Sequence, residues 1–156
     1  MSKIVSLFCI LLLTCSCAVA QNSENELVGA VLDNYHQAAA EGDWETYFDL
    51  LSEDAVFLGT DVNERWTKPE FQNYSANSSG WTYTPQSRNI NFTPDGNSAW
   101  FDEVLLSQSF GTSRGTGVLI RTSSGWKISQ YHLTIPLPNA LIREVTDEIK
   151  AFEAEQ

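Results

Sequence analysis

The side chains best suited to proton transfer are two histidines and one acidic pair: His36, His132, Asp102 and Glu103. A histidine exchanges a proton near neutral pH, and a carboxylate buried beside it would have a raised pKa that suits a proton shuttle. Adjacent strand residues point to opposite faces, so at most one acid of the pair can enter a pocket. We favour Asp102 as the catalytic acid and keep Glu103 as the alternative and as a ligand contact. The alternative is that both acids form structural or surface ion pairs and take no part in catalysis.

Alternation along the last expected strand, residues 126–135, turns His132 inward. One side of this strand carries Trp126, Ile128, Gln130 and His132. Lys127 and Ser129 on the other side indicate contact with water. His132 is then either a proton-transfer group in a pocket or a hydrogen-bonded residue that holds the strand end. His36 lies beside Tyr35 on the first expected helix, where a structural or surface role fits better.

Arg114 is a candidate anion-binding residue. Arg121 shares the outward direction of Lys127, so Arg114 on the same strand should point inward and lie near His132. An inward arginine beside a histidine is suited to hold a carboxylate. The alternative is an ion pair between Arg114 and an acid at the sheet edge.

A charged loop should lie at the mouth of a pocket. It follows the strand at residues 55–58 and contains Asp61, Glu64, Arg65 and Trp66. In this interpretation Asp61 contacts a ligand and Trp66 forms an apolar wall, whereas the alternative is a local salt bridge that leads into a helix. Further aromatic lining could come from Trp81, Trp100, Tyr83 and Phe57, for which core packing is the alternative.

Several common chemistries lack their motifs. Gly115-Thr116-Gly117 has neither the third glycine nor the following helix of a phosphate-binding loop. No serine stands in a Gly-x-Ser-x-Gly elbow. The two histidines are far apart, which leaves open only a metal site of one histidine with carboxylates. We therefore expect neither a metal nor a cofactor.

Charge and composition limit the class of protein. The chain has 156 residues, of which 42% are hydrophobic, so it fits a single domain with a core. It carries 20 acidic against 9 basic side chains, a net charge of −11. Nucleic acid is not expected as a partner, because binding a polyanion requires a basic face.

Residues 1–20 are expected to be a secretory signal peptide, followed by one domain over residues 21–156. Lys3, an apolar run over residues 4–13 and Ala18-Val19-Ala20 form the charged, hydrophobic and cleavage regions of such a peptide. The mature protein would be periplasmic or secreted. An uncleaved membrane anchor is the alternative.

The segment also holds all three cysteines, Cys9, Cys15 and Cys17, so the mature chain would have none. The residues before Cys15 and before Cys17 each match part of a lipoprotein signal. Lipidation at either cysteine is a further alternative and would anchor the protein to a membrane. Without a lipid, the negative charge of the protein disfavours binding to a membrane surface.

The hydrophobic pattern predicts helices first, then a long antiparallel sheet, then a last helix. A helix begins at the capping box of Ser23 and stops at Gly42. A second follows Asp43, with Trp44, Tyr47, Phe48 and Leu51 on its buried side. A third begins at the capping box of Thr67, and a final one follows Asn139. Strands are expected over residues 55–58, 82–92, 98–108, 113–122 and 126–135. This order predicts an α+β fold with helices packed on one face of a curved sheet.

The chain resembles the SnoaL-like branch of the nuclear transport factor 2-like superfamily. The resemblance is carried by Glu41-Gly42-Asp43-Trp44 with the strand at residues 54–57, by residues 59–66, and by residues 114–120 with 125–134. It implies a cone-shaped domain with a pocket at its open end, a homodimer through the outer sheet face, and a histidine late in the last strand at the pocket. It implies no particular activity, because the superfamily includes isomerases, cyclases, dehydratases, hydrolases, carriers and assembly modules.

Three functional hypotheses remain. In the first, an exported dimer binds a small, largely apolar molecule, with Arg114, His132 and an acid orienting its polar end. In the second, His132 and Asp102 or Glu103 act in a cofactor-independent isomerase, cyclase or hydrolase. In the third, the protein is a non-catalytic dimeric assembly module. An unpaired histidine–carboxylate couple in a dry pocket would favour the enzyme, and an aromatic pocket with internally satisfied polar groups would favour the binder. A filled pocket beside an apolar sheet face would favour assembly.

Overall fold

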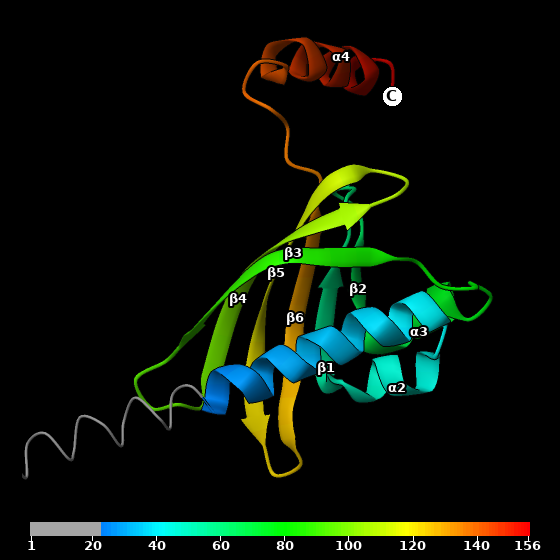
Figure 1. The fold of residues 1–156 in the computed structure, drawn as a ribbon. Helices are drawn as coiled ribbons and strands as arrows, with labels where there is room; N and C mark the ends of the chain where they lie inside the picture. Colours follow the sequence, from blue (N-terminus) through cyan, green and yellow to red (C-terminus); the bar gives the residue numbers. More distant parts are fainter. Residues whose placement is uncertain (1–22) are drawn as a thin grey trace, which may run out of the picture.

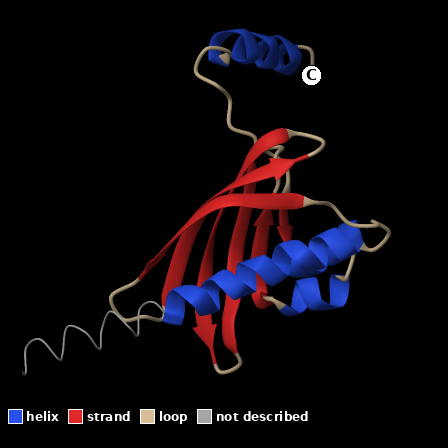
Figure 2. Cartoon of the chain, viewed as in Figure 1, coloured by secondary structure: helices blue, strands red, loops and turns tan. Residues whose placement is uncertain are grey.

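A computed structural model describes residues 23–156 of the chain, so the expected signal peptide lies outside the described residues. The first helix spans residues 23–41. The elements that follow are α2 (Trp44–Asp49), β1 (Leu51–Leu58), β2 (Arg65–Thr67), α3 (Lys68–Ser75), β3 (Tyr83–Phe92), β4 (Ser98–Ser107), β5 (Gly111–Thr122), β6 (Gly125–Thr134) and α4 (Ile142–Ala154). The predicted α+β order and the four long strands are confirmed (Figure 2).

One curved sheet runs in the order β2-β1-β6-β5-β4-β3. Its neighbours are antiparallel except for β1 and β6, which are parallel. The first helix crosses the concave face of the sheet, and α2 and α3 lie at one end of it (Figure 1). The domain is thus a cone that is filled along most of its length by the first helix.

The helix boundaries follow local rules. The first helix ends at Gly42, whose φ is +68°, and it buries one side made of Val28, Leu32, Tyr35, His36, Ala38 and Ala39. Asp43 accepts a hydrogen bond from the Thr46 backbone N–H at 3.1 Å, as expected of an N-cap. The expected capping box of α3 is also present, because Glu70 accepts from the Thr67 N–H at 2.8 Å.

The first two strands along the chain differ from the prediction. Leu51, expected on the second helix, begins β1, and the short strand β2 was not expected. Leu51 follows Tyr47 and Phe48 at helical spacing, so its apolar character fits either element. β2 has only three residues, which is too short for alternation to be recognised.

The last helix stands away from the sheet (Figure 1). It begins at Ile142 and its N-cap residue is Leu141, which makes no side-chain cap hydrogen bond, so the expected capping by Asn139 is wrong. The helix has no buried residue, and its apolar side is exposed at Ile142, Ile149 and Phe152. Within residues 23–156, no helix is both long enough and apolar enough to span a membrane.

A β-bulge in β6 reverses the side-chain directions in its second half. β5 pairs Leu119 with Ile128 but Val118 with Gln130, which leaves Ser129 without a partner. Ile128 is buried before the bulge, and Tyr131 is buried after it. His132, the next residue, therefore points to the outer face, and the expected inward direction of His132 is wrong.

We predict that deleting Ser129 keeps Tyr131 and Leu133 on the inner face, whereas inserting an alanine after Gln130 disrupts the fold. Without Ser129 only one residue separates Ile128 from Tyr131, so strict alternation places both side chains inward. The insertion adds a second residue beyond the bulge and turns Tyr131 and Leu133 out of the core, each at a cost of about 1.5–3 kcal/mol. Urea denaturation of the two variants measures the difference. An insertion variant as stable as the wild type would mean that the residue count through the bulge does not determine which side chains face inward.

Candidate functional site

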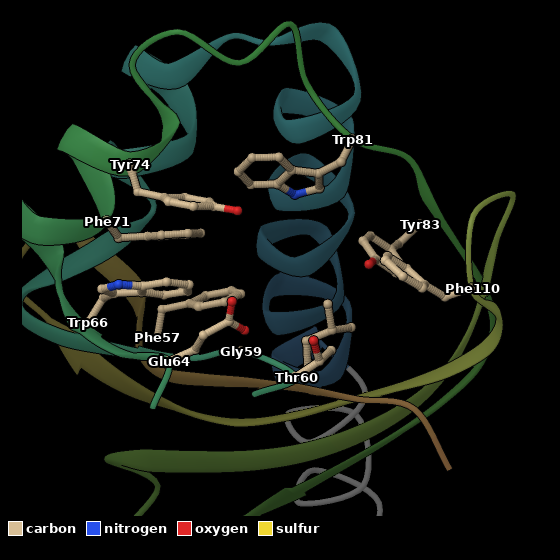
Figure 3. Close-up of a pocket in the computed structure, with 11 residues that line it drawn as sticks. Phe57, Gly59, Thr60, Glu64, Trp66, Phe71, Tyr74, Trp81, Tyr83 and Phe110 are labelled. Carbon is tan, nitrogen blue, oxygen red and sulfur yellow. The ribbon is translucent and has the colours of Figure 1, made fainter. Parts of the chain in front are cut away.

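An aromatic cavity of about 260 Å³ lies at the open end of the cone (Figure 3). Its walls come from β1, β2, β3, β6, α3 and the connecting segments. The lining residues are Phe57, Gly59, Thr60, Glu64, Trp66, Phe71, Tyr74, Trp81, Tyr83, Phe110 and Leu133. Seven of these eleven are aromatic, which makes the cavity a surface suited to flat apolar molecules.

One wall is a stack of four rings from β1, β2 and α3. The ring centroids of Phe57 and Phe71 are 4.1 Å apart, and those of Phe71 and Trp66 are 5.3 Å apart. Tyr74 continues the stack, 4.9 Å from Trp66. Figure 3 shows Tyr83 and Phe110 on the opposite side of the cavity. The ring faces are therefore held in place by one another before any ligand arrives.

Trp81 is positioned by the end of the first helix. Its backbone N–H donates to the Ala39 carbonyl at 3.0 Å, and its ring lies 4.6 Å from that of Trp44. The preceding Gly80 has a φ of +107°, and a Cβ there would be 2.5 Å from the Ala39 oxygen. Only glycine allows the chain to pass so close to the helix. The sequence-based expectation that Trp66 and Trp81 line the pocket agrees with this geometry.

The remaining sequence-predicted site residues lie elsewhere. Trp100 is 47% exposed on the outer sheet face. Asp102 and His132 are on the same face, because β5 pairs both with Thr116. Asp61 is an exposed loop residue that does not line the cavity. The structure therefore does not bring the predicted histidine–Asp102 pair to the pocket.

Arg114 is also exposed, and the expected inward direction is wrong. The cause is Arg121, which was expected to face water. Its guanidinium lies 4.5 Å from the ring centroid of Trp126, on the inner face, and forms an ion pair with Glu24 of the first helix. Because side chains alternate, an inward Arg121 turns Arg114 outward.

The acid that does face inward is Glu103, and its histidine partner is His36. Glu103 is 1% exposed. One carboxylate oxygen accepts from His36 Nε2 at 2.6 Å and from the Tyr131 hydroxyl at 3.0 Å. The other accepts from Arg88 Nε at 2.8 Å, and Arg88 also pairs with Asp33. None of these residues lines the cavity.

Sequence reasoning missed most of this buried network. His36 lies one helical turn after the buried Leu32, so helical spacing could have placed it inside. Arg88 alternates with Ile90 and Phe92, so strand spacing could have placed it on the inner face as well. The irregularity in the pairing of β3 with β4 lies before it, between Pro85 and Ser87.

The electrostatics of the network keep Glu103 ionised. Burial alone would raise the pKa of Glu103, but the hydrogen bond and charge of His36, together with the Arg88 guanidinium, outweigh burial and lower the pKa below 4.5. Burial and the Glu103 charge raise the pKa of Tyr131 well above its ordinary value, so its hydroxyl stays a donor. This arrangement suits a structural ion pair better than a proton shuttle.

The fold is shared with several solved structures. A candidate dehydratase of the nuclear transport factor 2-like family from Streptomyces avermitilis gives a TM-score of 0.64 at 18% identity, over 76% of this chain and 99% of the other. A candidate scytalone dehydratase from Novosphingobium aromaticivorans gives 0.66 at 13% identity, over 77% and 89%. A nuclear transport factor 2-like protein with a cystatin-like fold from the same organism gives 0.64 at 15% identity, over 83% and 92%.

A family-level match is more specific than these similarities of fold. A comparison with curated proteins found no match. Residues 28–138, well over half of the chain, match the SnoaL-like domain. The resemblance inferred from the sequence is thereby confirmed, and this chain belongs to the SnoaL-like family of nuclear transport factor 2-like folds.

Proposed function

We propose that this protein binds a small, largely apolar molecule of one or two rings in the aromatic cavity. The observation that carries the proposal is the composition of the cavity walls, seven of whose eleven residues are aromatic. Stacked and edge-on contacts with such walls stabilise a flat ligand beyond the gain from burial alone. A volume of about 260 Å³ matches a molecule of this size.

A few polar groups at the cavity can orient the ligand. Thr60 and Tyr83 contribute hydroxyls, and the Tyr74 hydroxyl points toward the open space (Figure 3). Such isolated donors and acceptors on an apolar surface fix orientation and supply specificity. They take the place of Arg114 and His132, which were expected to perform this task.

A cofactor-independent enzyme is the second candidate, favoured by the solved structures described as candidate dehydratases. Catalysis in the cavity would have to use Glu64, Tyr74 or Tyr83, the ionisable residues of its lining. The buried His36 and Glu103 are already hydrogen-bonded to each other, and this supports binding as the first candidate.

Export and pairing remain parts of the proposal. Residues 1–20 would direct the chain across a membrane and then be removed. Two copies would associate through the outer sheet face, where Trp100 and Leu106 are about half exposed. Large apolar side chains gathered on one exposed face are typical of an interaction surface.

We predict that Thr60→Phe weakens the binding of naphthol, a neutral two-ring probe, by at least about tenfold, because the added ring occupies the cavity. Thr116→Phe places the same ring on the outer sheet face and should leave the affinity unchanged. Isothermal titration calorimetry measures both. Equal affinities for the wild type and Thr60→Phe would contradict binding in the cavity.

We predict that Glu103→Gln lowers stability and leaves naphthol affinity unchanged. Removing the charge leaves the largely buried Arg88 with the exposed Asp33 as its remaining ion-pair partner, at a cost of up to about 3–5 kcal/mol. The pKa of Glu103 is lowered in the folded protein, so its stabilising contribution is present above 4.5 and disappears as the pH falls through the lower folded value. The stability difference from the wild type should therefore shrink in acid.

The matched control for this variant is Glu53→Gln. Glu53 pairs with Lys68 at the surface, where an ion pair contributes at most about 1 kcal/mol. Urea denaturation at neutral and acidic pH gives the stabilities, and calorimetry gives the affinities. A stable Glu103→Gln variant that fails to bind naphthol would mean that the Glu103 network takes part in ligand binding.

A further inference from the structure

The only charged side chain that lines the cavity is negative. Among its lining residues, Glu64 is the only carboxylate, and there is no lysine, arginine or histidine. The whole chain adds to this imbalance with a net charge of −11. A low-dielectric mouth lined by one sign of charge concentrates ligands of the opposite sign.

The loop between β1 and β2 holds the Glu64 carboxylate in place. The Gly59 N–H donates to the Glu64 carbonyl at 2.9 Å, and the Asp61 N–H donates to Glu64 Oε2 at 3.1 Å. The carboxylate lies so close to Gly59 that a Cβ there would be 2.1 Å from Oε2. In the part of the chain that the structure describes, Glu64 has no ion-pair partner, and its Oε1 accepts no hydrogen bond.

Aromatic rings lie near this carboxylate. Figure 3 shows Glu64 beside Phe57 and Trp66, with its oxygens toward the open space, and Trp81 across the cavity. The face of an aromatic ring carries partial negative charge and attracts a cation within about 6 Å of its centroid. A carboxylate and aromatic rings around one space form a site for a weakly hydrated positive charge.

We infer that the ligand of this cavity is an organic cation, an alkylated or protonated amine joined to a small apolar body. The inference rests on the proposed function and adds the charge of the ligand. Glu64 would contact the ammonium group, and the rings of Trp66 and Trp81 would lie against its alkyl substituents. The aromatic stack would hold the apolar body.

The other two charge classes fit the cavity less well. An anion would meet Glu64 and the ring faces with no cationic side chain to balance it. A neutral ligand that closed the mouth would remove water from the Glu64 carboxylate without replacing its hydrogen bonds, which is costly. A cation offsets this desolvation because it pairs with the carboxylate as water leaves.

Three probes of similar shape test the inference: phenyltrimethylammonium, its neutral isostere tert-butylbenzene, and the anion tert-butylbenzoate. Quenching of tryptophan fluorescence in the wild-type protein reports their binding. We expect phenyltrimethylammonium to bind at least about tenfold more tightly than tert-butylbenzene, and the anion to bind least. Equal or tighter binding of tert-butylbenzene would overturn the inference while supporting the proposed function. Binding of none of the three would overturn both.

Glu64→Gln keeps the shape of the side chain and an acceptor for the Asp61 N–H but removes the charge. We expect it to reduce the preference for phenyltrimethylammonium several-fold and to leave tert-butylbenzene binding unchanged. Asp61→Asn removes an equal charge from the same loop outside the lining and should change neither affinity. If Glu64→Gln weakened both probes equally, Glu64 would act on the shape of the loop rather than on ligand charge, and the inference would fail.

Discussion

The buried charge of Glu103 is the interaction on which the rest of the structure depends. A carboxylate with 1% exposure must be paired, and its partners come from the first helix, β3 and β6. These contacts join the first helix to the concave face of the sheet. In its last turn the same helix presents the Ala39 carbonyl that accepts from the Trp81 N–H, so the network that fixes the core also sets one wall of the cavity.

Much of the fold could be predicted because it is encoded locally. The caps at Asp43 and Thr67 and the stop at Gly42 are short-range signals, and the long strands alternate over enough residues to be recognised. Side-chain direction could not be predicted so reliably. It propagates along a strand, so the single unpaired residue Ser129 turns every later side chain of β6 to the other face.

The cavity was partly predictable for a related reason. Trp66 could be named because it stands in a charged loop expected at the pocket mouth, and Trp81 because large aromatic residues can supply further lining. The other walls, such as Phe110 and Leu133, come from elements far apart in the sequence and meet only when the sheet bends. The direction of β5 could not be read from Arg121, because this exposed residue lies on the inner face, where Glu24 and the ring of Trp126 balance its charge.

Fluorine NMR of the protein with its five tryptophans replaced by fluorotryptophan tests the central claim, that the aromatic cavity is the ligand site. Single Trp→Phe variants assign the resonances. Saturation with phenyltrimethylammonium should shift the signals of Trp66 and Trp81 and leave those of Trp100 and Trp126 in place. A shift confined to Trp100, on the outer sheet face, or unchanged signals from Trp66 and Trp81, would contradict the account.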